Sequence, residues 1–241
     1  MSKQPVLIDH DGGIDDFLSL ALLLTMDHVD TIGVVVTPAD CSIRPAVSIT
    51  RKLMHLMGFD HIPVAESTVR GLNPFPAAWR QSIYPIDLFP VLNDDPVETG
   101  PSVLQSGQVF IAETLRQAAE PVTLLVTGPL TTVAAALDIA PEIESRIKQI
   151  VWMGGALNVP GNVDPISEPG QDGSMEWNVY WDPPAAHQIW ATSIPIVLCP
   201  PIGSDVFGFD VPAPFGMRED VFSLILSLPV IFYSCAIFFT G

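Results

Sequence analysis

The feature that most constrains the fold is the alternation of short, wholly apolar runs with longer helical segments. Runs such as "PVLI" (5–8) and "TIGVVVT" (31–37) are apolar almost throughout rather than at every second residue. That pattern is typical of strands buried on both faces of a sheet. Strands are expected at 5–8, 31–37, 61–67, 121–128, 148–156 and 194–200, and helices at 15–26, 43–58, 109–119, 130–147 (with a break near Pro141) and 182–192.

This order of elements predicts an α/β fold, an open, mainly parallel, Rossmann-like sheet with helices on both faces. The chain of 241 residues has room for one such domain. Its hydrophobic fraction of 48% indicates a well-filled core rather than disorder. We expect a single α/β domain over residues 1–200.

The charge balance argues against nucleic acid as a partner. Ten Lys and Arg against 27 Asp and Glu give a net charge of −17, which repels phosphate backbones. Three cysteines without a short-spaced pair suggest neither a zinc site nor a disulfide framework. No apolar segment precedes the first strand, so no secretory signal is expected and the predicted location is the cytoplasm.

Four aspartates, Asp9, Asp11, Asp15 and Asp16, directly follow the first predicted strand in "PVLIDHDGGIDDF". Ligands bind at the carboxyl ends of strands in open α/β sheets, and like charges this close repel one another. A hard divalent cation with oxygen ligands, calcium or magnesium, would relieve the repulsion. The alternative is that Asp15 and Asp16 only cap a helix while Asp9 and Asp11 face water.

Two classes of enzyme use an aspartate cluster after a first strand. Phosphatases of the haloacid-dehalogenase type carry a D-x-D pair beside magnesium, but they also need a downstream lysine and a second acidic pair. Lys148 is the only lysine after Lys52, and no G-D-x-x-x-D stretch follows it. The other class is the nucleoside hydrolases, whose D-x-D-x-x-x-D-D loop binds calcium and ribose.

Further segments favour the second class. The sequence resembles the nucleoside hydrolases, most closely the purine-preferring inosine–adenosine–guanosine type. Seven pieces appear in the family's order between about residues 5 and 199, namely "DHDGGIDDF", "PADC", "NPFPAAWR", "VTGPLT", "MGGA", "GN" and "EWNVYWDP". Each piece is a weak signal alone, whereas seven in order are specific.

The resemblance implies a calcium site in the aspartate loop. Asp11 would be a calcium ligand and also the general base that deprotonates the attacking water. Asp16 would be a bidentate ligand and Thr127 would supply its backbone carbonyl. Asp15 would hold ribose hydroxyls, and Asp9 would lie behind the ligands without touching the metal.

The resemblance also implies the contacts to sugar and base. Asn162, Glu176 and Asn178 would bind ribose hydroxyls, and Met153 would line the sugar pocket. Asp40 and Trp79 would face the base, with Trp79 stacked on a purine. Without its flanking "NPFPAAWR", Trp79 would instead be interpreted as a partly buried aromatic in a proline-rich loop.

The expected reaction is therefore calcium-dependent hydrolysis of the N-glycosidic bond of purine ribonucleosides. A homodimer is expected if the fold is complete. Two alternatives stay open: a non-catalytic or truncated protein of this fold, and the magnesium-dependent phosphatase.

The resemblance ends after Cys199. Family members carry a further aspartate motif near the C-terminus, and no H-D or W-D pair follows Cys199 here. The fold is therefore expected to be C-terminally incomplete, which puts activity in question. Residues 201–241 are expected to form a divergent hydrophobic tail. Val221 to Thr240 carries no charge and is long enough to cross a bilayer, but Pro229 and the lack of flanking basic residues argue against membrane contact.

Overall fold

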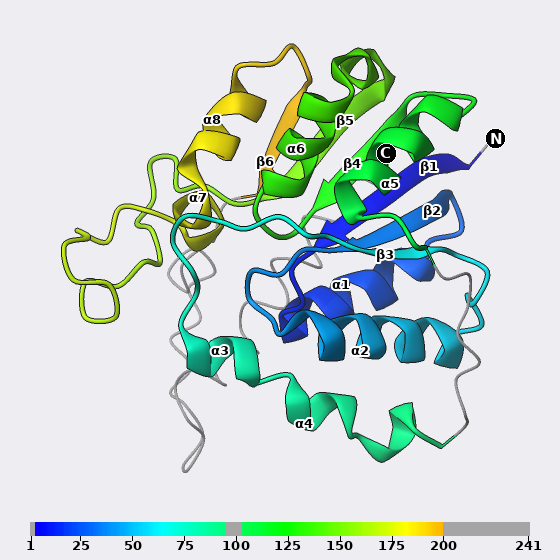
Figure 1. Ribbon diagram of the computed structural model, residues 1–241, viewed down its shortest axis with the longest axis horizontal. Coiled ribbons are helices and arrows are strands. Elements are labelled where there is room, and N and C mark those ends of the chain that lie inside the picture. The colour runs from blue at the N-terminus through cyan, green and yellow to red at the C-terminus, as the bar shows by residue number, and fades with distance from the viewer. Residues whose placement is uncertain (1–2, 95–102, 200–241) are drawn as a thin grey trace.

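A parallel six-stranded sheet forms the centre of the protein, seen here in a computed structural model that describes residues 3–94 and 103–199. The strand order is β3-β2-β1-β4-β5-β6, and every neighbouring pair is parallel (Figure 1). This confirms the predicted open, parallel, Rossmann-like sheet. The strands are β1 (Gln4–His10), β2 (Val29–Val36), β3 (Val64–Glu66), β4 (Val122–Val126), β5 (Ile147–Met153) and β6 (Ile196–Cys199).

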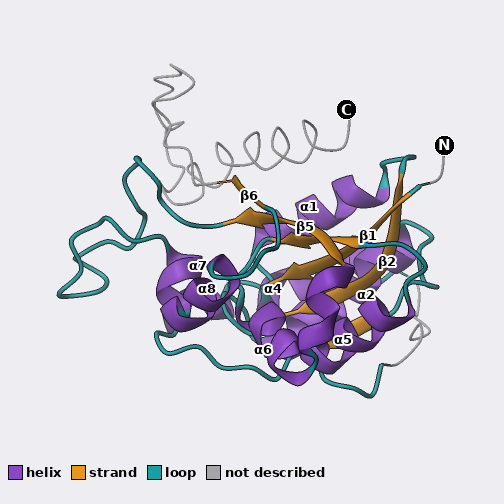
Figure 2. Cartoon of the chain, turned by 90° about the horizontal axis from the view of Figure 1, so that it is seen from above, coloured by secondary structure: helices purple, strands orange, loops and turns teal. Residues whose placement is uncertain are grey.

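Helices cover both faces of the sheet, as the apolar strands require (Figure 2). Successive residues of β1 point to opposite faces: Val6 and Ile8 pack in one buried cluster with α1 and α2, and Leu7 packs in the other with α5, α6 and α8. These five helices are α1 (Ile14–Leu24), α2 (Ile43–Leu56), α5 (Gly107–Gln117), α6 (Thr131–Ile139) and α8 (Pro183–Trp190).

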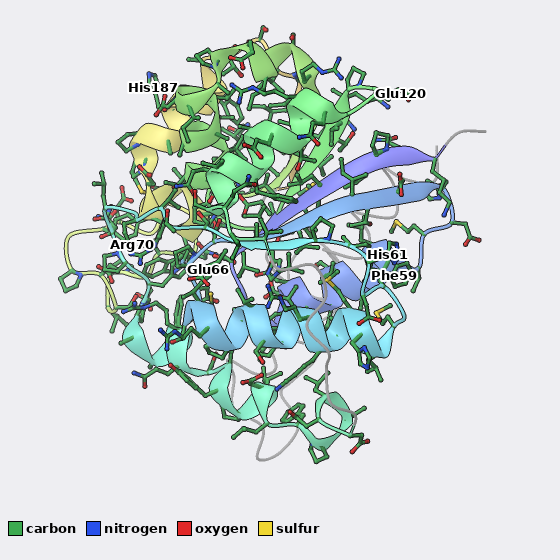
Figure 3. The ribbon with its side chains drawn as sticks, turned by 45° about the vertical axis from the view of Figure 1, so that its right-hand side comes forward. Phe59, His61, Glu66, Arg70, Glu120 and His187 are labelled. Atoms are coloured by element: carbon green, nitrogen blue, oxygen red, sulfur yellow. The ribbon has the colours of Figure 1, made fainter. Side chains whose placement is uncertain are left out.

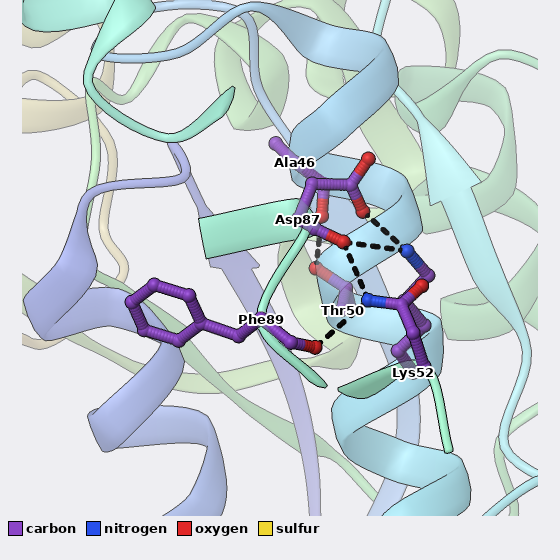
Figure 4. A network of polar contacts seen from close by, with 6 residues as sticks. Ala46, Thr50, Lys52, Asp87 and Phe89 are labelled. Atoms are coloured by element: carbon purple, nitrogen blue, oxygen red, sulfur yellow. Dashed lines mark hydrogen bonds and ion pairs between the residues drawn. The ribbon is translucent and has the colours of Figure 1, made fainter. Parts of the chain in front are cut away.

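Several short helices were not predicted. Four prolines between Pro74 and Pro90 interrupt any longer helical periodicity there. The unexpected elements are α3 (Ala77–Gln81), α4 (Tyr84–Asp87), the 3₁₀ turn η1 (Pro90–Leu92) and α7 (Trp177–Trp181). The Lys52 ammonium on α2 holds α4 in place, because it donates to both the carboxylate (2.7 Å) and the carbonyl (2.8 Å) of Asp87 (Figure 4).

Two boundaries differ from the expectation in a way that affects the site. β1 continues beyond residue 8 through Asp9 and His10, which pair with Val35 and Val36 of β2. β5 ends at Met153, before the two glycines that were included in the predicted strand. The break expected near Pro141 is confirmed, since α6 ends at Ile139 and the 3₁₀ helix η2 (Pro141–Arg146) follows.

The sheet changes direction of winding between β1 and β4. The chain leaves β1 for β2 on one side, whereas β4 leads to β5 on the other. At such a point the connecting loops diverge and leave a crevice outside the carboxyl ends of the strands. The aspartate loop follows β1 and Thr127 follows β4, so the topology brings both to this crevice.

The direction of the strands can be followed along β3. Phe59 and His61 precede the strand at one end of the sheet, and Glu66 and Arg70 lie at the other, the carboxyl ends of the strands (Figure 3). In the described part of the chain, no helix is both long and apolar enough to cross a membrane. The hydrophobic tail predicted at 201–241 lies outside the described residues.

Candidate functional site

The aspartate loop is buried rather than solvated. Asp9, Asp11 and Asp16 are 1%, 5% and 3% exposed, so the interpretation in which Asp9 and Asp11 face water is wrong. The loop turns at Gly12, whose φ of +83° suits glycine and whose Cα lies against Cys41. Asp16 does cap α1, because one carboxylate oxygen accepts the Gly13 N–H at 2.8 Å.

Carboxylates crowd around Gly13. A Cβ at this position would lie 2.6 Å from an Asp15 oxygen, 3.4 Å from an Asp40 oxygen and 3.5 Å from an Asp16 oxygen. Asp11 lies close enough to Asp16 for the charge of Asp16 to raise the pKa of Asp11. The absence of a side chain at Gly13 therefore lets acidic oxygens from the first turn of α1 and from the loop that carries Asp40 approach its Cα.

Burial and mutual repulsion oppose ionisation of this cluster. Burial, followed by the charge of Asp16, raises the pKa of Asp11 well above its usual range and the pKa of Asp15 to about 7. Burial, with the charges of Asp15 and Asp16, raises the pKa of Asp40 to about 8, although Arg80 partly offsets this. The carboxylates can all be ionised together only if a positive charge joins them.

The loop after β4 brings Thr127 to the same place. The Asp11 side chain packs on Gly128, where a Cβ would lie 2.7 Å from the Asp11 Cβ. The Asn178 side-chain amide donates to the Thr127 carbonyl (3.2 Å) and to the Met153 carbonyl (2.9 Å). Asn178 thus connects the predicted metal-binding carbonyl to the predicted sugar pocket, across 51 residues of sequence.

The other predicted ribose residues are engaged by backbone groups. The buried Glu176 carboxylate accepts the N–H groups of Gly155 (2.9 Å), Asn178 (2.9 Å) and Val179 (3.2 Å) and so caps α7. Asn162 accepts the Trp177 N–H at 2.9 Å. These bonds fix both side chains beside Asn178 and Met153, and they use part of the hydrogen-bonding capacity that a sugar would need.

The predicted base-binding side is aromatic. Trp79 on α3 is 42% exposed, and its ring centroid lies 5.2 Å from that of Trp177, which in turn stacks on Phe75 at 5.0 Å. The carbonyl of Arg80 accepts the backbone N–H of Ser42 at 3.0 Å, which joins α3 to the loop carrying Asp40. Trp79 is therefore neither buried nor isolated.

The sequence interpretation did not include Trp177, although it lies between Glu176 and Asn178 in the quoted "EWNVYWDP". Its ring belongs to a small buried cluster that holds the loops around the crevice together; the cluster contains Ala39, Phe75, Val163, Trp177 and Trp181. An aromatic residue between two predicted sugar ligands was the signal available, but only the fold shows that it reaches Trp79.

The donor set suits a hard cation. Among the described residues, buried oxygens without a hydrogen-bond partner include Asp40 Oδ1 and Thr127 Oγ1, and carboxylate and carbonyl oxygens are the ligands that calcium prefers. No three His, Cys, Asp or Glu side chains in residues 3–94 and 103–199 already converge as a metal cage. The residues that could hold a bound ion are those predicted from the sequence, Asp11, Asp16 and the Thr127 carbonyl.

Comparison with known proteins identifies a family. A family model described as inosine-uridine preferring nucleoside hydrolase matches residues 6–208. The pyrimidine-specific ribonucleoside hydrolase RihA of Shewanella woodyi is 32% identical over 200 residues, which cover 81% of this chain and 59% of that protein. RihA of Escherichia coli O139:H28 is 31% identical over 198 residues, covering 80% and 59%.

Solved structures match the fold. The inosine-uridine preferring nucleoside hydrolase of Bacillus anthracis superposes with a TM-score of 0.83 at 38% identity, over 97% of this chain and 81% of that one. The purine-preferring ribonucleoside hydrolase of Gardnerella vaginalis gives 0.64 at 26% identity, over 81% and 60%.

An open parallel sheet with an acidic crevice at its switch point defines an α/β protein with a candidate cation site. The chain belongs to the inosine-uridine preferring nucleoside hydrolase family. It spans 59% of the length of the two RihA relatives.

Proposed function

We propose that this protein hydrolyses the N-glycosidic bond of ribonucleosides and releases ribose and the free base. The observation that carries the proposal is the position of Asp11. Its buried side chain lies near the charge of Asp16 and packs on Gly128, which follows Thr127 in the chain. This position supports the proposal because the proposed base follows β1, and the proposed carbonyl ligand, which accepts from Asn178, follows the neighbouring β4.

Asp11 is the proposed catalytic base, and Asp11, Asp16 and the Thr127 carbonyl are the proposed calcium ligands. Bound Ca²⁺ would compensate the clustered charge and lower the pKa of a water molecule. Asp11, kept ionised in that environment, would accept the proton of the attacking water. Burial of the loop excludes bulk water and strengthens these electrostatic interactions.

The sugar would be gripped by Asp15, Asn162, Glu176 and Asn178, with Met153 beside it. Negative and amide oxygens around the 2′- and 3′-hydroxyls favour a ribose that develops positive charge as the base departs. Because Glu176 and Asn162 already accept backbone N–H groups, their positions are set before a substrate arrives. Such preorganisation lowers the cost of orienting the sugar.

We further propose a preference for purine bases, supported by the half-exposed Trp79 and by Asp40. An indole face offers more stacking area to two fused rings than to one. Pyrimidine nucleosides are the second candidate, because the two RihA relatives are described as pyrimidine-specific.

Four expectations stay predictions: a domain over residues 1–200, a tail over 201–241, a homodimer and a cytoplasmic location. Family membership argues against the phosphatase hypothesis. A measurement of ribose release decides whether the protein is catalytic or not.

Ribose release tests the proposal directly. We expect the purified chain with calcium to release reducing sugar from inosine and guanosine, and to release no phosphate from a general phosphate ester. Inosine and uridine should be compared at equal concentration. A folded, calcium-supplied chain that releases no ribose from any of these nucleosides would identify it as non-catalytic.

Replacing Trp79 tests the choice of base. Base–aromatic stacking contributes about 1–3 kcal/mol, so Trp79→Ala should lower kcat/KM for inosine roughly tenfold to a hundredfold and leave that for uridine nearly unchanged. Trp190→Ala is the control, since Trp190 is an exposed tryptophan on α8. A better rate with uridine, or an unchanged inosine-to-uridine ratio in Trp79→Ala, would assign the chain to the pyrimidine branch.

A further inference from the structure

A chain of buried hydroxyl groups leads to the aspartate loop, and none of the proposed roles uses it. It consists of Thr37 after β2, Thr132 on α6 and Ser67 after β3, all at most 2% exposed. Thr37 Oγ1 lies 2.7 Å from Asp9 Oδ1 and 2.6 Å from Thr132 Oγ1, and Thr132 Oγ1 lies 2.9 Å from Ser67 Oγ. Four polar side chains from different elements are thus joined in a line.

Counting protons gives the line a direction. The Thr37 hydroxyl donates its single proton to Asp9 Oδ1, which can accept it whether or not the other carboxyl oxygen carries a proton. Thr37 must then accept from Thr132, and Thr132 must accept from Ser67. The Val69 N–H approaches Ser67 Oγ at 3.4 Å. Every hydroxyl dipole therefore points toward Asp9.

If the hydroxyl protons of this line were donated away from Asp9, one of them would have no acceptor. If Asp9 donated to Thr37, the Ser67 hydroxyl would end the line as a donor. Among the described residues, Ser67 Oγ has one hydroxyl partner, Thr132, and its other contact is a backbone donor. The Ser67 proton would then be buried without an acceptor, which is costly. The arrangement directed at Asp9 leaves no proton without a partner.

This line is the side-chain support of Asp9. In the described part of the chain, Asp9 Oδ2 has no hydrogen-bond partner, so Thr37 is the side-chain donor to this carboxyl. The backbone of the same segment is held on two sides: the Asp9 carbonyl accepts the Thr127 N–H at 3.0 Å, and the His10 carbonyl accepts the Thr37 N–H at 2.7 Å. Asp11 follows two residues later.

We propose that Thr37, Thr132 and Ser67 are positioning residues that orient Asp9 and thereby hold Asp11 and Thr127 at the spacing needed for a cation. The proposal rests on the proposed function, since the cation is the one inferred there. Groups behind the ligands of a metal commonly change its affinity 10–100-fold when they are removed. Because the hydroxyl groups act on Asp9 one through the next, the loss of cation affinity on removing a hydroxyl should decrease with its distance from Asp9.

Calcium binding, measured by isothermal titration calorimetry on the full chain, tests this order. We expect Thr37→Val to weaken binding roughly tenfold to a hundredfold, Thr132→Val less, and Ser67→Ala least. Thr37→Ser restores the hydroxyl and should recover most of the affinity. Thr123→Val is the matched control: Thr123 is fully buried on β4, and its hydroxyl bonds Gln4 at the amino end of the strands, away from the crevice.

Equal affinity in Thr37→Val and the parent chain, or an equal loss in Thr123→Val, would overturn the positioning role. A parent chain that binds no calcium would refute the proposed cation site instead. In that case a double-mutant cycle on unfolding free energies, with Thr132→Val and Asp9→Ala, decides the inference without metal. These two residues do not bond each other, so non-additivity supports coupling through Thr37, and additivity rejects it.

Discussion

Replacing Asp11 with alanine should lower kcat for inosine about a hundredfold to ten-thousandfold, the range that a positioned general base contributes. The same change should weaken calcium binding, because one carboxylate is proposed for both roles. Asp11 is buried and packs on Gly128, so its replacement removes the one carboxylate that is proposed as the base. Steady-state ribose release with the variant saturated in calcium measures the effect on kcat.

Asp11→Asn separates charge from packing. It keeps the volume that fills the space against Gly128 and removes the base, so it should be almost as inactive as Asp11→Ala while retaining more stability. Asp30→Ala, which removes an exposed aspartate on β2, is the control for a change of net charge. Near-parental kcat in Asp11→Asn would exclude Asp11 as the base.

The sequence predicted the sheet well because buried parallel strands are apolar throughout. It placed the end of β1 too early for a physical reason. A strand that continues into Asp9 and His10 looks like a loop, since charged residues are rarely buried. Here the Thr37 hydroxyl donates to one carboxyl oxygen of Asp9, and the Thr50 hydroxyl lies 3.2 Å from His10. Such partners come from other strands and helices, so no local pattern shows them.

The candidate site was predictable only as a set of residues. The seven motifs named its members, and the fold adds how they are connected. The amide of Asn178 reaches the carbonyl of Thr127, and the ring of Trp177 joins Trp79 to the sugar side. Neither contact follows from spacing in the chain. Helix α3, which carries Trp79, could not be predicted from the proline-rich segment either. The helix is short, and contacts to Ser42 hold it rather than an apolar periodicity of its own.

Calcium should stabilise the protein, and Asp16 should be required for that effect. A ligand that binds only the folded state contributes about 2.7 kcal/mol at one hundred times its Kd. For a domain of this size, that corresponds to a rise in Tm of roughly 5–10 °C. Differential scanning calorimetry with calcium, with magnesium and with excess chelator measures the rise, which should be largest with calcium.

Asp16→Asn is the sharper variant for this test, because its amide oxygen can still accept the Gly13 N–H that caps α1 while the charge is lost. Two opposing effects then act on the variant. Without calcium it should be at least as stable as the parent chain, since one of several buried, mutually repelling carboxylates has been neutralised. With calcium the parent should gain stability and the variant should not, so the order of the two Tm values reverses. A calcium-induced rise of the same size in Asp16→Asn would show that the cation binds elsewhere and would remove Asp16 from the site.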